Sequence, residues 1–265
     1  MLPSWRDRVR IRLSPTQVEV LRYSRGWRPT QVEHKVIPCH ETAERAETSR
    51  PAWAPAVETL REFLVNAHPR RASADVILSN LYVRYVLVPW SAALVTEQEQ
   101  LAFARARFVK MYGEAAQGWM LRLSSSVAGS DRVAAGVEGA LLESLTTLLH
   151  KSPFALTSIQ PQLMAWFNAA RKTIGPDAWL AVAEPGRILL GLVRGGRWMT
   201  LRSRPLNSET VALGELLEQE RLMSGIEQGG EKICLRVMPG VQFDTSGLRV
   251  QSFSGPDAAL EISAS

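Results

Sequence analysis

The residues best suited to metal binding gather at one place in the sequence. His34, Cys39 and His40 are the only group in which such side chains lie close together. A structural zinc site takes four ligands, usually in closely spaced pairs, and no second Cys-x-x-C or His-x-x-x-His pair accompanies this group. We therefore expect no metal site and interpret these residues as the polar ends of surface strands.

Nucleophile and acid–base motifs are also missing. The chain has no G-x-S-x-G, H-E-x-x-H, G-x-x-x-x-G-K-[ST] or G-x-G-x-x-G, the spacings of nucleophile elbows, zinc hydrolases and phosphate loops. No histidine lies near Ser124, Ser125 and Ser126 to activate a hydroxyl, and Glu138 and Glu143 show no acid–base pattern. The sequence predicts no catalytic residue and no cofactor, so we expect a protein that is not an enzyme.

The charged residues are mostly arginine and favour acidic partners. Lys and Arg total 31 against 26 Asp and Glu, a formal charge of +5. Arg6, Arg8, Arg10 and Arg12 alternate, which places them on one face of a strand. We favour a solvated strand face, then a protein-docking face that uses guanidinium forks, and last a nucleic-acid surface. Because the other arginines are mixed with glutamates, we expect no nucleic-acid partner.

Tryptophan supplies the clearest hint of a docking surface. Of the eight tryptophans, Trp166 and Trp179 lie in apolar patterns and are predicted core residues. Trp27 lies in a polar stretch beside Arg25 and Arg28. Trp and Arg are both enriched where proteins contact each other, so these three residues are the predicted partner-binding group.

Length and composition indicate a globular protein. The chain has 265 residues, of which 46% are hydrophobic and 22% charged, a balance that excludes a mainly disordered chain. No apolar run approaches the roughly 18 residues that cross a bilayer. The start, MLPSWRDRVRIRLS, lacks the apolar core of a signal peptide, and two cysteines exclude a disulfide framework. We expect a cytoplasmic protein that does not insert directly into a membrane.

Two β-meanders set the order of the predicted elements. Alternation predicts strands at 8–13, 17–23 and 31–37, and Gly195-Gly196 predicts a hairpin within a second set. Thr96 to Glu99 form a capping box that begins a helix. The other predicted strands are 75–79, 83–88, 118–124, 132–137, 178–183, 187–193, 197–202, 232–238 and 248–253; the predicted helices are 55–66, 96–112, 138–150, 161–174 and 208–223.

This duplicated order resembles the actin-like fold of sugar kinases, Hsp70 and actin. The stretch 75–90, which contains VILSNLYVRYVLVPW, and YGEAAQGWMLRL at 112–123 are similar to the cytoplasmic actin-like domains of bacterial pilus and secretion machines, the PilM, MshI and GspL families. The resemblance implies an α/β fold with two related lobes, each a β-meander plus helices. The lobes would comprise residues 1–154 and 155–265, the second ending in a frayed tail.

The resemblance also locates two turns that bind phosphate in actin-like ATPases. Those enzymes carry Asp-x-Gly after the first strand of each half, where the aspartate serves magnesium and the glycine admits phosphate. Here Arg12 and Ser14 stand at the first turn, and Glu184 and Gly186 at the second. We interpret these positions as a degenerate nucleotide site. For Glu184 and Gly186 we favour an ordinary turn between strands over a remnant site.

A two-lobed scaffold without phosphate chemistry implies a non-enzymatic adaptor. By resemblance it would dock components of a type IV pilus or type II secretion-like machine. Its partners would be proteins, including the cytoplasmic segment of a membrane protein that would hold it at the inner membrane. The alternative is a protein of the same fold that binds ATP with weak or no hydrolysis.

Overall fold

The chain forms two compact units, neither of them continuous in sequence. The computed structural model describes residues 7–26, 30–39, 50–66, 70–125, 129–206, 210–227 and 229–253. One unit comprises Met1–Val83 and Val137–Ala165, and the other Arg84–Gly136 and Trp166–Ser265. The boundary predicted between residues 154 and 155 differs from this division. It falls at the start of β8 (Phe154–Pro161), a strand of the first unit.

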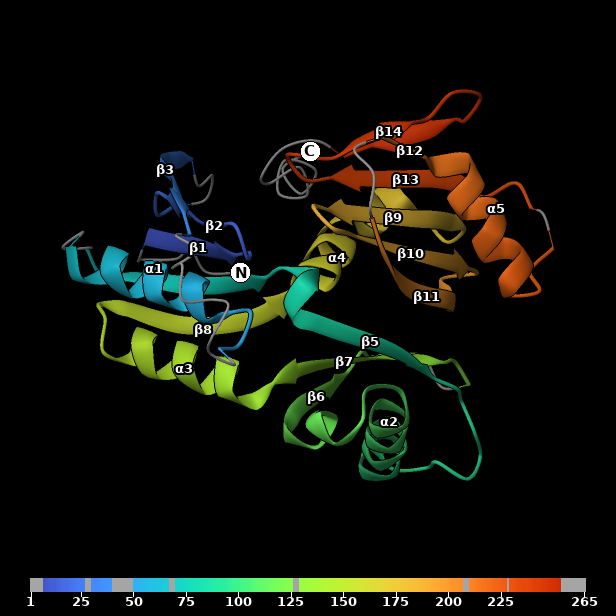
Figure 1. Cartoon of the computed structure of the whole chain (residues 1–265), viewed down its shortest axis with the longest axis horizontal. Helices are drawn as coiled ribbons and strands as arrows, with labels where there is room; N and C mark the ends of the chain where they lie inside the picture. The colour runs from blue at the N-terminus through green and yellow to red at the C-terminus, as the bar shows by residue number, and fades with distance from the viewer. Residues whose placement is uncertain are drawn as a thin grey trace. The chain divides into compact units, whose positions relative to one another are not determined.

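The first unit contains a five-stranded sheet built on the predicted meander (Figure 1). β1 (Asp7–Leu13), β2 (Gln17–Tyr23) and β3 (Gln31–Pro38) pair antiparallel, as the alternation predicts. β4 (Ala72–Leu78) and β8 add parallel strands, giving the order β3-β2-β1-β4-β8. β8 was not predicted, because its half-exposed residues alternate poorly and its pairing with β4 is non-local.

Two helices cover the apolar residues of this sheet. Val9, Ile11 and Leu13 alternate along β1 and are almost fully buried. α1 (Ala54–Asn66) packs against β2 and against α3 (Gly139–His150), which in turn packs against β8 (Figure 1). Apolar residues recur at every second position along the strands and about every 3.6 positions along the helices. Each element therefore has one apolar face, and these faces pack together in the shared core.

The sheet of the second unit repeats this strand order. β9 (Ala178–Glu184), β10 (Arg187–Arg194) and β11 (Arg197–Pro205) are antiparallel, and β13 (Lys232–Val237) and β15 (Val250–Ser252) are parallel additions. The order is β11-β10-β9-β13-β15. Every residue of β9 is buried, which is typical of a central strand that is covered on both faces.

Two helices supply the residues that cover this second sheet. Leu213 and Leu217 of α5 (Leu213–Met223) join the core of β9, β10 and β13. From α4 (Gln162–Ile174), Trp166 contacts Phe253 with ring centroids 5.5 Å apart, and Phe167 similarly contacts Trp198. Trp166 and Trp179 are 3% and 7% exposed, so the prediction that both belong to the core is confirmed.

In this unit the sequence predicts the hairpin turn correctly but places the start of the last helix too early. Gly195 and Gly196 both have positive φ and form the predicted two-residue hairpin between Arg194 and Arg197. The helix predicted from 208 begins only at Leu213, because β12 (Thr210–Ala212) pairs in parallel with β14 (Gln242–Asp244). That ladder joins segments far apart in sequence, so local pattern did not reveal it.

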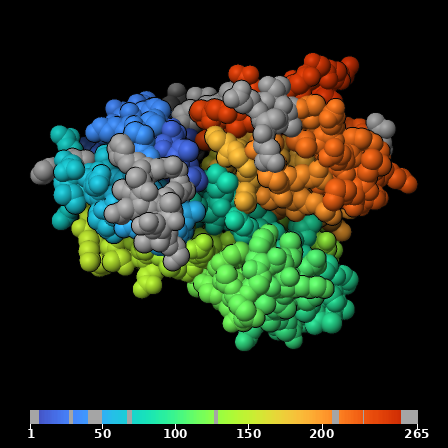
Figure 2. Space-filling view, in the orientation of Figure 1, coloured from blue at the N-terminus to red at the C-terminus, as the bar shows by residue number. Residues whose placement is uncertain are grey.

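Residues 84–136 form a small subdomain of their own, which we call the α2 subdomain. β5 (Val83–Val88), β7 (Arg132–Glu138) and β6 (Trp119–Leu123) make its sheet in that order. α2 (Glu97–Tyr112) and the short helix η3 (Glu114–Gly118) complete it, and its atoms form one compact body in green (Figure 2).

The predicted capping box begins α2. Thr96 N–H donates to Glu99 Oε2 at 2.8 Å, and Glu99 N–H donates to Thr96 Oγ1 at 3.2 Å. Another short helix, η2 (Asn80–Tyr82), precedes β5. Across the described residues, no helix has the length and apolarity needed to span a membrane.

Candidate functional site

The first predicted phosphate turn is closed by its own hydrogen bonds. Ser14 N–H donates to the carbonyl of Gln17 at 3.0 Å, and the Ser14 hydroxyl donates to the same carbonyl at 2.9 Å. Gln17 N–H donates back to Ser14 Oγ at 3.1 Å. Cys39 N–H donates to the carbonyl of Thr16, and Ser79 N–H to that of Leu13. The groups of Ser14 that would face a phosphate therefore bond within the turn.

Arg12 is held by a carboxylate on the next strand. Its Nη1 lies 3.0 Å from Glu19 Oε2, and His34 Nε2 lies 2.8 Å from the other oxygen of Glu19. The Arg12 side chain is only 12% exposed. The favoured interpretation of the arginine run as a solvated face is therefore wrong for Arg12; Arg6 lies outside the described residues.

The second predicted turn is a two-residue hairpin connection. Glu184 pairs with Arg187 across β9 and β10, so Pro185 and Gly186 are its central residues. Gly186 has φ +82°, and proline followed by a glycine of positive φ is the sequence of a type II turn. The favoured interpretation, an ordinary turn between strands, matches this geometry. A Cβ at Gly186 would meet nothing within 4 Å, so the turn has open space beside it.

Glu184 is a buried acid whose charge acts on Tyr85 and Arg187. Glu184 is 4% exposed. Burial raises the pKa of Tyr85 well above its ordinary value, and the Glu184 charge adds to this, so Tyr85 stays a neutral phenol. Burial lowers the pKa of Arg187, with a further contribution from the Arg84 charge. The charge of Glu184 thus acts on a guanidinium, that of Arg187, whereas a magnesium site would gather oxygen ligands around the acid.

The residues considered for metal binding are separated. His34 contacts Glu19, while Cys39 Sγ lies 3.8 Å from the carbonyl of Ser14. Burial raises the pKa of the Cys39 thiol, which disfavours the thiolate that a metal would need. His40 lies outside the described residues. Within the described ranges, no three His, Cys, Asp or Glu side chains are grouped for a metal ion.

The predicted partner-binding group is described only in part. Arg25 is exposed in the turn after β2. Trp27 and Arg28 lie outside the described residues. Their joint role in docking therefore stays a prediction.

Asp75 is a buried acid that the sequence analysis missed. It lies in β4 at 5% exposure and accepts hydrogen bonds from Thr157 Oγ1 and Ser158 Oγ, both at 2.7 Å, and from Arg8 Nε at 2.6 Å. The available signal was an acid that begins the apolar run Asp-Val-Ile-Leu. These bonds join β1, β4 and β8. They also give Arg8, a member of the arginine run, a carboxylate partner.

The contacts of Asp75 predict a loss of stability in acid. Burial alone would raise its pKa, but the two hydroxyls and Arg8 outweigh it, so the pKa lies below its ordinary value. The stabilisation is therefore complete above the unfolded pKa of about 3.9 and is lost as pH falls through the lower folded value. Urea midpoints should show Asp75→Asn much less stable than wild type near neutral pH and closer to it in strong acid. The exposed Glu143→Gln is the control, and parallel pH curves for wild type and Asp75→Asn would contradict the prediction.

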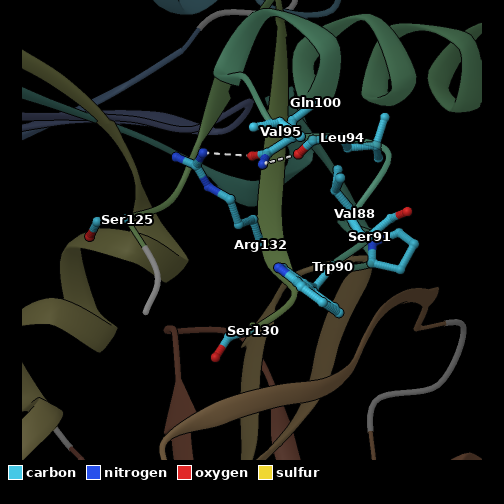
Figure 3. Close-up of a pocket in the computed structure, with 11 residues that line it drawn as sticks. Val88, Trp90, Ser91, Leu94, Val95, Gln100, Ser125, Ser130 and Arg132 are labelled. Atoms are coloured by element: carbon cyan, nitrogen blue, oxygen red, sulfur yellow. Dashed lines mark hydrogen bonds between the residues drawn. The ribbon is translucent and has the colours of Figure 1, made fainter. Parts of the chain in front are cut away.

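A pocket at one end of the α2 subdomain is a second site that the sequence analysis missed (Figure 3). It has a volume of about 600 Å³ and lies between the end of β5, the start of α2 and the start of β7. We call it the Trp90 pocket. Its lining residues are Val88, Pro89, Trp90, Ser91, Ala92, Leu94, Val95, Gln100, Ser125, Ser130 and Arg132.

Comparison with known proteins identifies the fold. No protein-family model matches the chain, and no curated protein matches its sequence. Among solved structures, the cytoplasmic domain of EpsL, an inner membrane component of the type II secretion system of Vibrio cholerae, matches with a TM-score of 0.60 and 11% identity. That match covers 97% of this chain and 94% of the chain of the EpsL cytoplasmic domain.

Two further structures agree with this match. A chain from the PilM–PilN type IV pilus biogenesis complex has a TM-score of 0.58 and 15% identity, covering 91% of this chain and 89% of the other. A Bacteroides thetaiotaomicron protein of unknown function with an actin-like ATPase fold has a TM-score of 0.54 and 10% identity, covering 88% and 82%. This protein therefore has the predicted actin-like α/β fold.

Proposed function

We propose that this protein is a non-enzymatic adaptor with an actin-like fold that docks components of a type IV pilus or type II secretion-like machine. The support from comparison is the fold shared with the EpsL domain and with a chain of the PilM–PilN complex. The proposed partners are proteins of such an assembly, among them the cytoplasmic segment of a membrane protein. The proposed location is the cytoplasm, at the inner membrane through that partner.

The closed first turn is the observation that carries the proposal. Magnesium-dependent phosphate chemistry needs oxygen ligands for the cation and free N–H groups for the phosphate. At the first turn a guanidinium, Arg12, stands in place of the carboxylate and is already paired with Glu19. The amide and hydroxyl of Ser14 are used within the turn. Binding a nucleotide there would require breaking several of these bonds.

Calorimetry with ATP and magnesium tests the proposal. We expect no saturable heat at high protein concentration and no thermal shift at millimolar ATP, because a ligand that binds the folded state raises its melting temperature. Saturable binding would overturn the claim that Arg12 and Ser14 disable the site.

The alternative is nucleotide binding without hydrolysis, and one observation favours it. The second turn retains a buried acid, Glu184, and a glycine with open space beside it, Gly186. If ATP binds, Glu184→Gln should change the heat of binding. An unchanged heat in that variant would place the nucleotide elsewhere on the protein.

A further inference from the structure

Among the described residues that line the Trp90 pocket, the charged side chain is positive. Arg132 is its only ionisable lining residue, and none of the described residues that line it is acidic. Arg132 Nε donates to the carbonyl of Ser124 at 2.7 Å, and Nη1 donates to Gln100 Oε1 at 2.8 Å. Both acceptors are neutral. The pocket therefore presents a guanidinium whose described acceptors do not include a carboxylate, which suits an anionic ligand group.

The guanidinium is held in place by a short chain of hydrogen bonds. Gln100, which accepts from Arg132, donates its own Nε2 to the carbonyl of Leu94 at 2.9 Å (Figure 3). These bonds link β7, the first turn of α2 and the loop before it. Because the cation is ordered before a ligand arrives, little side-chain freedom is lost on binding.

A hydroxyl in the same pocket has no partner. Ser130 is 8% exposed, and its Oγ is buried with no hydrogen-bond partner in the described structure. Leaving a buried polar group unsatisfied is unfavourable, so such groups call for an explanation. Because this oxygen is buried and in Figure 3 points away from the Arg132 guanidinium, Ser130 lines the pocket without serving as a donor to a ligand.

Two large apolar side chains that line the pocket are exposed. Trp90 and Val95 are 57% and 78% exposed. The N–H of Trp90 donates to Asp131 Oδ1 at 3.0 Å, which anchors the backbone that carries the indole. Asp131 itself lines a different pocket. Trp and Arg are the side chains most often responsible for binding energy between proteins, so this combination favours a peptide over a small polar ion.

We propose that the Trp90 pocket binds a peptide segment of a partner protein in which large apolar residues are followed by Asp or Glu. The apolar side chains pack on Trp90 and Val95, and the carboxylate accepts from the Arg132 guanidinium. The volume falls within the roughly 300–1,000 Å³ typical of ligand pockets. This inference deepens the proposed adaptor function and rests on it, since it specifies the chemistry of one partner.

Titration of the full chain with short labelled peptides tests the inference. Two mixtures of peptides are used, each peptide acetylated at its N-terminus and amidated at its C-terminus. Both contain a pair of large apolar residues, which is followed by Asp in the first mixture and by Asn in the second. Fluorescence anisotropy should show the Asp mixture binding about tenfold more tightly, because a charge-assisted hydrogen bond replaces a neutral one. In protein labelled with fluorotryptophan, the resonance that disappears in Trp90→Phe should shift on binding.

Variants assign the binding to this pocket. Arg132→Gln removes the charge, so the affinity for the Asp mixture should fall by about tenfold, to that of the Asn mixture. Trp90→Ala should reduce that affinity by about tenfold or more. Met120→Ala is the matched control, because Met120 is 58% exposed in the same subdomain and does not line the pocket.

Several results would overturn the inference. These are no binding of either mixture, equal affinity for Asp and Asn mixtures, or wild-type affinity in both Arg132→Gln and Trp90→Ala. Displacement of the peptide by an equal concentration of acetate would instead indicate a simple anion site and would also contradict it. Since the titration contains no nucleotide, its failure is distinct from a failure of the ATP experiment.

Discussion

Replacing Glu220 by alanine should lower the free energy of unfolding by about 3 kcal/mol, since removing one partner of a buried ion pair leaves the other charge uncompensated. Glu220 is fully buried on α5. Its Oε1 accepts from Thr200 Oγ1 at 2.9 Å and from Ser224 Oγ at 3.0 Å, while Oε2 lies 3.0 Å from Arg204 Nη2. The variant would leave these donors without their shared acceptor.

The expected loss lies at the lower end of the range for buried pairs because water reaches the two cations. Arg202 Nε also lies 3.0 Å from Glu220 Oε1, and the Arg202 and Arg204 side chains are 44% and 19% exposed. These cations can hydrate in part once the carboxylate is removed. The midpoint of urea unfolding measures the effect, and an unchanged slope shows that stability alone has changed.

Two matched variants separate charge from hydrogen bonding at this position. Glu220→Gln keeps an acceptor for the hydroxyls and should cost less than Glu220→Ala. Glu218→Ala removes an acid from the same helix that is 52% exposed and pairs with Arg221, and its midpoint should match wild type. If Glu220→Ala were as stable as Glu218→Ala, the network would not stabilise the contact between β11 and α5.

Replacing Phe108 by alanine should cost about 3–5 kcal/mol, the usual range when a buried aromatic ring is removed. Phe108 is fully buried in the core of the α2 subdomain. Its ring meets Trp119 edge-on at 5.8 Å and stacks near Tyr112 at 6.1 Å between centroids. A Cβ added at Gly136 would lie 3.2 Å from the Phe108 ring, so the ring packs closely on that strand.

Met111→Ala is the control for this variant. Met111 lies one turn further along α2 and is 58% exposed, so its truncation removes little buried surface and creates no cavity. Thermal and urea unfolding of the two variants should differ clearly. Similar stabilities would mean that the ring of Phe108 does not support the subdomain.

Local pattern determined the two meanders and most turns of this protein. Strands with alternating residues need only neighbours in sequence to pair as hairpins, so β1 to β3 and β9 to β11 were predictable. The Gly195-Gly196 hairpin and the Thr96–Glu99 capping box were equally local, because their geometry depends on a few residues' own dihedrals and hydrogen bonds. The repeated meander, through its resemblance to known actin-like domains, implied the fold that the structure has.

Tertiary structure alone decided the unit boundaries and the polar contacts. β8 and β12 exist as strands because of parallel ladders to distant segments. The pairing of Arg12 with Glu19 depends on the register between β1 and β2. The alternation of residues shows on which face of the strand Arg12 lies, but it does not show which residue of β2 lies opposite.

The Trp90 pocket shows most clearly what local sequence pattern cannot predict. Ser130 and Arg132 are unremarkable in the sequence, and they meet Trp90 and Gln100 only because β5, β7 and α2 fold together. Side-chain type and spacing therefore determined which segments become strands, helices and turns. Which side chains share a pocket or an ion pair was decided by non-local packing, because those neighbours are distant in the chain.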